Sequence, residues 1–269
     1  MEERHPDTCA VIIDQANRRI IEIRKSMLVN QITRDADRIA KSFDALHAGD
    51  LEKVSSQFAH CFGVLTSGML KATEEGDDLR IACGELLSNS LNSIAAAAYM
   101  LRGGFVLQPG PVIRSAIESM AVALHLMQFQ KDLTKHREHK FDSTRAIASA
   151  KRVFPPFGQF YGLLSKEFTH IGQLYKQFTP ICEYTSSYEP LGLNLQFIMS
   201  GVWMCYVACE LVFFDVVAQP RYWSEVPSDA QDQTPYCYDP SANEKSWMAE
   251  FFGIDSSGLD GAGVMHAPM

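Results

Sequence analysis

Apolar residues recur every three or four positions along most of the chain, and the alternation of apolar and polar residues typical of exposed strands is nearly absent. This spacing predicts amphipathic helices that are separated by short polar breaks. The expected helices, the first of which is a single helix or a pair, run from Ala10 to His47, from Asp50 to the sequence EEGDD, from Asp78 to LRGG, from Pro111 to Phe129, from Lys131 to Val153, from Pro156 to Ile171 and from Leu191 to Val217. We therefore predict an all-α fold with fewer than about one residue in twenty in strands.

Several of the breaks have local causes in the sequence. Asp50 follows the HAG sequence and suits the N-cap of the next helix. Gly103 or Gly104 can adopt the left-handed conformation that closes a helix, and Pro111 suits a first helical turn. These signals place the ends of the middle helices more firmly than the apolar spacing alone.

The helices up to residue 220 are expected to form one helical-bundle domain, 1–220, with extra N-terminal helices. Beyond Pro220 the chain is rich in Pro, Asp, Gln and Gly, which predicts an irregular, poorly packed tail over 221–269. The tail contains a short helix with four apolar residues through which it could dock: Trp247, Met248, Phe251 and Phe252.

The stretch from Leu191 to Val217 is long and apolar enough to cross a bilayer. It contains four polar residues: Asn194, Gln196, Glu210 and Asp215. Because polar and ionisable groups are costly in the middle of a bilayer, we favour a buried core helix and expect no membrane contact. Cys205 and Cys209 would then be small packing residues one turn apart.

Composition and charge limit the class of partner. The 46% hydrophobic content is that of a folded globular chain. The 24 basic and 32 acidic residues give a net charge of −8, so no overall positive field attracts nucleic acid or anionic membrane. RNA binding remains possible only through a local basic patch.

The seven cysteines are odd in number and include no C-x-x-C pair, which argues against a disulfide framework or a zinc knuckle. The N-terminal sequence does not resemble a secretory signal, so we expect a cytoplasmic protein. No phosphate-binding, dinucleotide-binding or nucleophile-elbow motif is present, and we expect no cofactor. A densely charged segment offers possible metal ligands, but we interpret it as a solvated helix face: Asp132, His136, Glu138 and His139.

A polar row on an otherwise apolar helix is the main candidate site. Arg114, Glu118 and His125 fall on one side of the helix from Pro111 to Phe129. The row is either a structural clamp or part of a pocket. A buried Arg114–Glu118 pair predicts that Arg114→Ala costs roughly 3–5 kcal/mol of stability, whereas a solvent-filled site predicts little loss.

Two further features could add to such a site. Asn89 and Asn92 share a helix face with Glu85, where their amides could hydrogen-bond another helix or simply face solvent. His170 lies just before Gly172, at the expected end of a helix. The helix C-terminus favours a protonated histidine, so His170 is either an acid or anion-binding group or an ordinary capping residue.

Four segments in succession, NSIAAAAYMLRGG, IRSAIESMAVALHL, KFDSTRAI and YGLLSKEFTHIG, resemble a family of bacterial helical proteins of unknown function. That family is related to the higher eukaryote and prokaryote nucleotide-binding (HEPN-like) domains. The similarity covers about residues 79–214. The residues that carry it are Arg114, Glu118, Lys140, Phe141, Tyr161, Leu164, Ser165 and His170.

The resemblance implies an antiparallel helical bundle, commonly dimeric, with a polar site among its middle helices. The candidate catalytic residues are then Arg114, Glu118 and His170, and the candidate ligand-binding residues are Asn89, Asn92, Tyr161 and Ser165. HEPN ribonucleases use an Arg followed about four to six residues later by a His, to flank one phosphodiester with a cation and an acid or base. No arginine here is followed by histidine at that spacing.

Two functional hypotheses follow. The first is a non-catalytic homodimeric module that binds an unknown protein or a small ligand, in which the polar row holds the bundle together. The alternative is a HEPN-like ribonuclease or nucleotide-handling protein of a toxin or defence system, in which Arg114, Glu118 and His170 form the site. The first hypothesis requires no convergence of Arg114 and His170 on an open cleft, whereas the second does.

Overall fold

A computed structural model of the chain describes residues 5–166, 181, 183–186, 189–226 and 236–252. The strands are β1 (Thr8–Asp14), β2 (Arg19–Arg24), β3 (Trp223–Glu225) and β4 (Tyr236–Tyr238). The α-helices are α1 (Met27–Asn30), α2 (Ala36–Glu75), α3 (Asp78–Arg102), α4 (Pro109–Gln128), α5 (Leu133–Arg137), α6 (Ser143–Val153), α7 (Pro156–Leu164), α8 (Glu189–Val212) and α9 (Ala242–Phe252). The predicted all-α class is confirmed.

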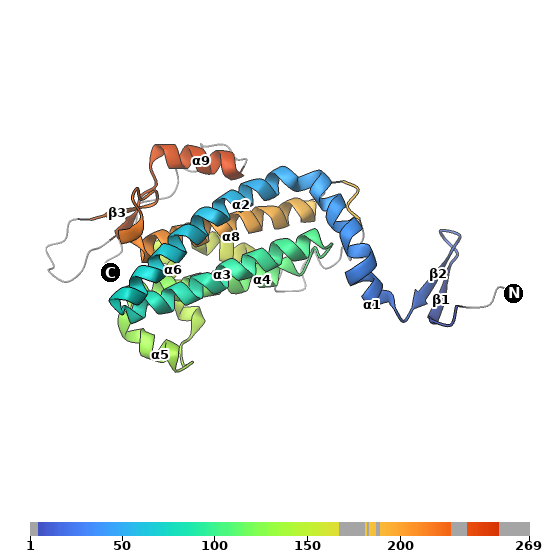
Figure 1. Cartoon of the computed structure of the whole chain (residues 1–269), viewed down its shortest axis with the longest axis horizontal. Helices are drawn as coiled ribbons and strands as arrows, with labels where there is room; N and C mark the ends of the chain where they lie inside the picture. Colours follow the sequence, from blue (N-terminus) through green and yellow to red (C-terminus); the bar gives the residue numbers. More distant parts are fainter. Residues whose placement is uncertain (1–4, 167–180, 182, 187–188, 227–235, 253–269) are drawn as a thin grey trace.

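The long helices α2, α3, α4 and α8 lie side by side and form a bundle, and α2, α3 and α4 follow one another through short turns (Figure 1). α8 packs against the other three, and every residue from 201 to 212 is buried. Its segment Pro190–Val212 is long and apolar enough for a membrane span, but 89% of the apolar 18-residue stretch within it is buried inside the bundle. α8 is therefore a core helix, as we favoured from the sequence.

Local signals fix the ends of the middle helices. The Asp77 carboxylate caps α3 by accepting hydrogen bonds from the backbone N–H groups of Leu79 and Arg80, at 3.1 and 3.0 Å. Gly76 ends α2 with φ of 67°, and Gly104 follows α3 with φ of 91°, so both adopt the left-handed conformation that glycine favours. The expected boundaries at Asp78 and at the LRGG sequence are confirmed.

The N-terminal segment differs from the expectation. Residues 8–24 form an antiparallel β-hairpin in place of the start of a helix from Ala10 to His47. Its strands are rich in Val and Ile, whose β-branched side chains favour strands. Arg18 in the turn has φ of 51°, and the Asp14 carboxylate accepts a hydrogen bond from the Asn17 backbone at 3.1 Å. The four strands hold 7, 6, 3 and 3 residues, so the predicted strand content was too low.

Two other expected breaks differ in detail. The expected break at the HAG sequence is a kink at His47, whose φ of −134° is not helical, and two helical segments continue across it as α2. Asp50 hydrogen-bonds the His47 ring at 2.9 Å. The expected helix from Lys131 to Val153 is divided into α5 and α6. His139 between them has φ of 56°, a left-handed conformation that no helix continues through.

The described part of the segment after residue 220 is not poorly packed. Tyr222 and Trp223 are buried against α8, and Tyr238 lies 4.9 Å from the Phe154 ring, centroid to centroid. Met248 and Phe251 of α9 also join the core, as the docking expectation required. The aromatic residues that we assigned to a tail therefore close one side of the bundle.

Candidate functional site

Arg114, Glu118 and Tyr161 meet between α4 and α7. The Arg114 Nε donates a hydrogen bond to Glu118 Oε1 at 3.2 Å, and an Arg114 guanidinium Nη donates to the Tyr161 hydroxyl at 2.9 Å. The same hydroxyl donates to Glu118 Oε1 at 3.2 Å. The guanidinium carbon also lies 5.3 Å from the centre of the Tyr161 ring, within the range of a cation–π contact.

This cluster is partly exposed, with 28% of the Arg114 side chain and 34% of the Glu118 side chain accessible to solvent. Burial opposes the charge of Arg114, but the Tyr161 hydroxyl and Glu118 outweigh it, so the pKa of Arg114 is raised. The cluster is therefore neither a fully buried ion pair nor an open pocket. Its hydrogen bonds hold α7 against α4.

Arg114→Ala should lower the free energy of unfolding by about 1 kcal/mol, well below the cost of breaking a buried pair, because solvent screens the charges. A double-mutant cycle with Tyr161→Phe should show a coupling of about 0.5–1.5 kcal/mol, measured by urea denaturation. The exposed Arg152 on α6 provides the control, and Arg152→Ala should cost less than about 0.5 kcal/mol. Additive effects of the Arg114 and Tyr161 substitutions would contradict the clamp.

His125 does not belong to the polar row that we predicted. Its ring is fully buried, with Nδ1 2.6 Å from the Ser149 hydroxyl and Nε2 3.1 Å from Asp132 Oδ2. The other Asp132 oxygen accepts a hydrogen bond from Lys135 Nζ at 2.8 Å. His125 differs because α6 and the turn after α4 cover it, while Arg114 and Glu118 contact α7 and stay partly exposed.

Ser149, His125 and Asp132 are the residue types of a hydrolase triad, but they are not accessible to a substrate. The exposed fractions of these three side chains are at most 1%, so no substrate reaches the serine. Ser149 also lies 3.0 Å from the Ala146 carbonyl oxygen, which accepts its hydrogen bond within α6. The set is a buried polar network that joins α4, α6 and the turn before α5.

The remaining predicted site residues lie as follows. The Asn89 amide donates to the Ser119 hydroxyl at 3.2 Å, which links α3 to α4, and Asn92 is exposed on α3. The Ser165 hydroxyl is buried and has no hydrogen-bond partner among the described residues. His170 lies outside the described residues. The structure thus joins Arg114, Glu118 and Tyr161, and the ribonuclease alternative stays a prediction.

Two of the four possible metal ligands on the charged segment have other partners. Asp132 belongs to the buried network, and the Glu138 carboxylate pairs with Lys140 at 2.9 Å. In the described parts of the chain, one group of three metal-ligating side chains brings its donor atoms within 4.8 Å of one another, and it consists of Cys61, Cys205 and Cys209. The sequence analysis missed this group because the Cys61 and Cys209 positions are 148 residues apart.

The role of a buried carboxylate on the expected core helix was not predicted. Glu210 is fully buried on α8, and its Oε1 accepts hydrogen bonds from three consecutive backbone N–H groups, of Arg221, Tyr222 and Trp223, at 2.8, 2.6 and 3.1 Å. Burial raises the pKa of Glu210, and the three N–H groups oppose that shift. Glu210 therefore fixes the chain after residue 220 to the central helix.

The fold and these contacts define an all-α helical-bundle protein with an interhelical Arg–Glu–Tyr cluster. Comparison with known protein families, curated proteins and solved structures finds no match.

Proposed function

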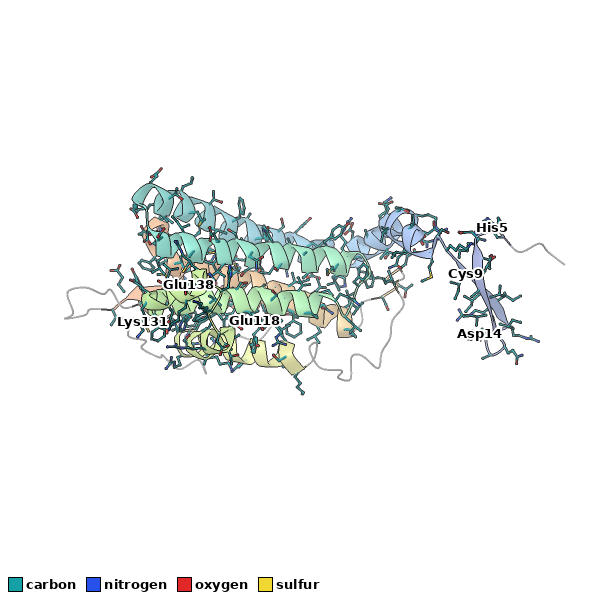
Figure 2. All side chains as sticks on the ribbon, turned by 90° about the horizontal axis from the view of Figure 1, so that it is seen from below. His5, Cys9, Asp14, Glu118, Lys131 and Glu138 are labelled. Atoms are coloured by element: carbon teal, nitrogen blue, oxygen red, sulfur yellow. The ribbon has the colours of Figure 1, made fainter. Side chains whose placement is uncertain are left out.

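We propose that the chain is a non-catalytic, cytoplasmic module that forms a homodimer through its N-terminal hairpin. The hairpin of β1 and β2 projects from the end of the bundle, beyond α1 (Figure 1), and its side chains extend into solvent (Figure 2). Several of its large apolar residues are exposed: Val11, Ile12, Ile13, Ile20 and Ile21. This exposed apolar hairpin is the observation that supports the proposal.

The register places a pair of isoleucines on each face of the hairpin. Ile12 pairs with Ile21 on one face, and Ile13 pairs with Ile20 on the other. Strands that are apolar on both faces are typical of sheets that are covered on both sides. The apolar surface continues into the next segment, where Met27 is 59% exposed.

An isolated two-stranded hairpin is at best marginally stable in water, and unpaired edge strands are templates for pairing with another chain. The helices of the bundle do not cover this hairpin (Figure 1). Pairing with another strand would satisfy the outward backbone groups and remove the apolar side chains from water. A partner strand is therefore the occupant that the hairpin requires.

Charge distinguishes the two edges. β2 carries Arg19, Glu22 and Arg24, and charged side chains protect a strand edge against pairing. β1 has no charged residue before Asp14. The β1 edge is therefore the open one.

A second copy of β1 fits this edge. Antiparallel pairing of β1 with β1 of a second copy about Val11 places Val11 opposite Val11, Ala10 opposite Ile12, and Thr8 opposite Asp14. No like charges meet in this register. The same arrangement of two β2 strands about their centre would place Arg19 opposite Arg24, which is unfavourable.

Two other apolar stretches of the sequence offer less surface for a dimer. The apolar α8 helix is covered by its own bundle. Of the four alanines in the AAAA sequence, Ala97 is buried, while Ala95 and Ala96 are exposed on α3. The uncovered apolar surface that supports association lies instead on the hairpin.

A cysteine at position 11 should join two chains. In a Cys9→Ser background, Val11→Cys places two thiols opposite each other, with Cβ atoms about 4.5–5.5 Å apart. Mild oxidation should then give a covalent dimer whose cross-linked peptides both contain residue 11, identified by mass spectrometry. Ile20→Cys, on β2, is the control: Ile20 is more exposed than Val11, 73% against 39%, and should still not cross-link.

Val11→Lys tests the same interface without a cross-link, because it places two positive charges opposite each other. Light scattering at tens of micromolar should show a dimer for the wild-type chain and a 30.1 kDa monomer for this variant. A wild-type monomer, or equal cross-linking through positions 11 and 20, would contradict the homodimer. Binding of RNA or of a different protein to a monomeric hairpin would support another occupant.

A further inference from the structure

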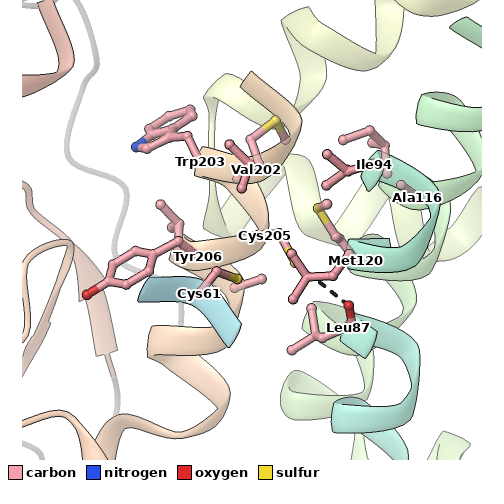
Figure 3. Packing of buried hydrophobic residues seen from close by; sticks show 14 of the residues in the cluster. Cys61, Leu87, Ile94, Ala116, Met120, Val202, Trp203, Cys205 and Tyr206 are labelled. Carbon is pink, nitrogen blue, oxygen red and sulfur yellow. Dashed lines mark hydrogen bonds between the residues drawn. The ribbon is translucent and has the colours of Figure 1, made fainter. Parts of the chain in front are cut away.

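Three thiols from two helices meet in the core of the bundle. Cys61 lies on α2, and Cys205 and Cys209 lie one turn apart on α8. Figure 3 shows Cys61 and Cys205 at this contact between the two helices. Their sulfur atoms all lie within 4.8 Å of one another, and Cys61 Sγ is 3.6 Å from Cys209 Sγ. A tetrahedral or pyramidal centre with bonds of about 2.3 Å to sulfur separates its sulfur ligands by about 3.8 Å, so this spacing suits a shared centre.

The surroundings of the cluster are apolar. All three thiols are 0% or close to 0% exposed, and Leu87, Met120 and Val202 pack near Cys205 (Figure 3). The Cys205 thiol lies 3.8 Å from the Leu87 carbonyl oxygen. The residues labelled around Cys205 in Figure 3 are apolar or aromatic core residues, and none of them carries a charge.

Because no positive side chain lies among these residues, the charge of the bound ion must itself balance the charge of the thiolates. A coordinated thiol is deprotonated, so three cysteines supply three negative charges. A monovalent metal ion would leave a net charge of −2 in the core, and a divalent ion would leave −1. A trivalent centre leaves none, and a buried net charge is very costly in an apolar environment.

We propose that Cys61, Cys205 and Cys209 form a binding site for one trivalent thiophilic centre of the arsenite or antimonite class. Binding is a condensation: each of the three hydroxyl groups of neutral arsenous acid leaves as water with the proton of one thiol, and three As–S bonds replace three As–O bonds. Three waters are released, the oxidation state of arsenic does not change, and no oxidant or reductant is needed.

The ligand must enter through a closed interface. Because the sulfur atoms are sealed between α2 and α8, the two helices have to separate locally before arsenous acid reaches them. A neutral molecule crosses the apolar surroundings more easily than a hydrated cation. Because the helices must separate first, binding should be slow. The bound centre would then join α2 to α8 by covalent bonds, so it should stabilise the bundle.

The test uses the full chain, reduced with a phosphine, because a thiol reductant would compete for the ligand. After incubation with sodium arsenite and desalting, arsenic is counted by elemental analysis and located by intact mass. The wild-type chain should retain one arsenic in place of three protons and should melt at a higher temperature. Cys61→Ser should lose this retention.

Cys83→Ser is the matched control, since Cys83 is also fully buried but donates instead to the Ala123 carbonyl oxygen, at 3.6 Å. It should bind arsenic as the wild-type chain does. Cys209→Ala provides a second ligand variant, and circular dichroism checks that each variant is folded. Loss of retention in Cys61→Ser and Cys209→Ala, but not in Cys83→Ser, is the expected result.

Three results would overturn the proposal. The first is no retained arsenic in the folded wild-type chain, and the second is equal retention without Cys61. The third is stoichiometric retention of zinc or copper(I) in preference to arsenic, which would assign the cluster to a metal ion. None of these results depends on the hairpin, so the homodimer and the thiol site can fail separately.

Discussion

Asp132→Ala should lower the free energy of unfolding by roughly 3–5 kcal/mol, one of the two largest losses that we expect from a single polar side chain in this protein. The Asp132 side chain is only 1% exposed and bonds both His125 and Lys135. Its removal leaves the His125 Nε2 without a partner in a site that water does not reach, and Lys135 loses its carboxylate. Urea denaturation followed by circular dichroism measures the loss.

Glu138→Ala is the matched control, because Glu138 lies in the same segment and pairs with Lys140 at the surface, where both side chains are at least half exposed. An exposed ion pair contributes little, so this variant should change the stability by less than about 0.5 kcal/mol. A similar loss in both variants would show that the segment, and not the buried network, limits stability.

The same network should make the fold sensitive to acid. Hydrogen bonds from Lys135 and His125 lower the pKa of Asp132 to about 2 from a usual value of 3.8. The unfolded chain therefore takes up this proton first, and the stabilisation is complete above about pH 4 and is lost as the pH falls towards 2. Burial lowers the pKa of His125, so stability should also begin to fall as the pH drops below about 6.5.

Glu210→Ala should cost roughly 3–5 kcal/mol, because it leaves the N–H groups of Arg221, Tyr222 and Trp223 without their acceptor inside the protein. Glu210→Gln is the informative comparison. Its amide oxygen can replace Oε1, and the other carboxylate oxygen of Glu210 has no hydrogen-bond partner among the described residues. The glutamine variant should therefore retain most of the stability.

Urea denaturation distinguishes the two variants of Glu210. A glutamine variant as unstable as the alanine variant would show that the negative charge, and not the acceptor atom, holds the turn. Release of the segment from α8 should also expose Trp223, whose indole N–H donates to the Val207 carbonyl oxygen at 2.8 Å. Tryptophan fluorescence should shift to longer wavelength in the alanine variant.

The sequence predicts best those elements whose causes are local. Asp77 caps α3 through residues two and three positions later, and the glycines after α2 and α3 end those helices within one turn. The hairpin was missed because Ile12 and Ile13 face opposite sides of it, so its strands show no alternation of apolar and polar residues. The order of residues along one strand does not show whether another part of the protein, or a partner, covers both faces of the hairpin.

The candidate site was harder to predict because its residues come from distant parts of the sequence. The Arg114–Glu118 spacing is visible within one helix, and Tyr161 emerged only through the resemblance, since it lies 47 residues from Arg114. His125 has the same helical phase as Glu118, but the elements that bury it come later in the chain. Helical phase predicts which residues share a side and does not predict what covers that side.

The central place of α8 has a consequence for synthesis of the chain. α2, α3 and α4 all pack on a helix that begins only at Glu189. At about 5–20 residues per second, a ribosome needs on the order of ten seconds to go from the end of α2 to the end of α8. During that interval the apolar sides of the first three helices lack their common neighbour, so the nascent chain is a natural client for chaperones until its last long helix emerges.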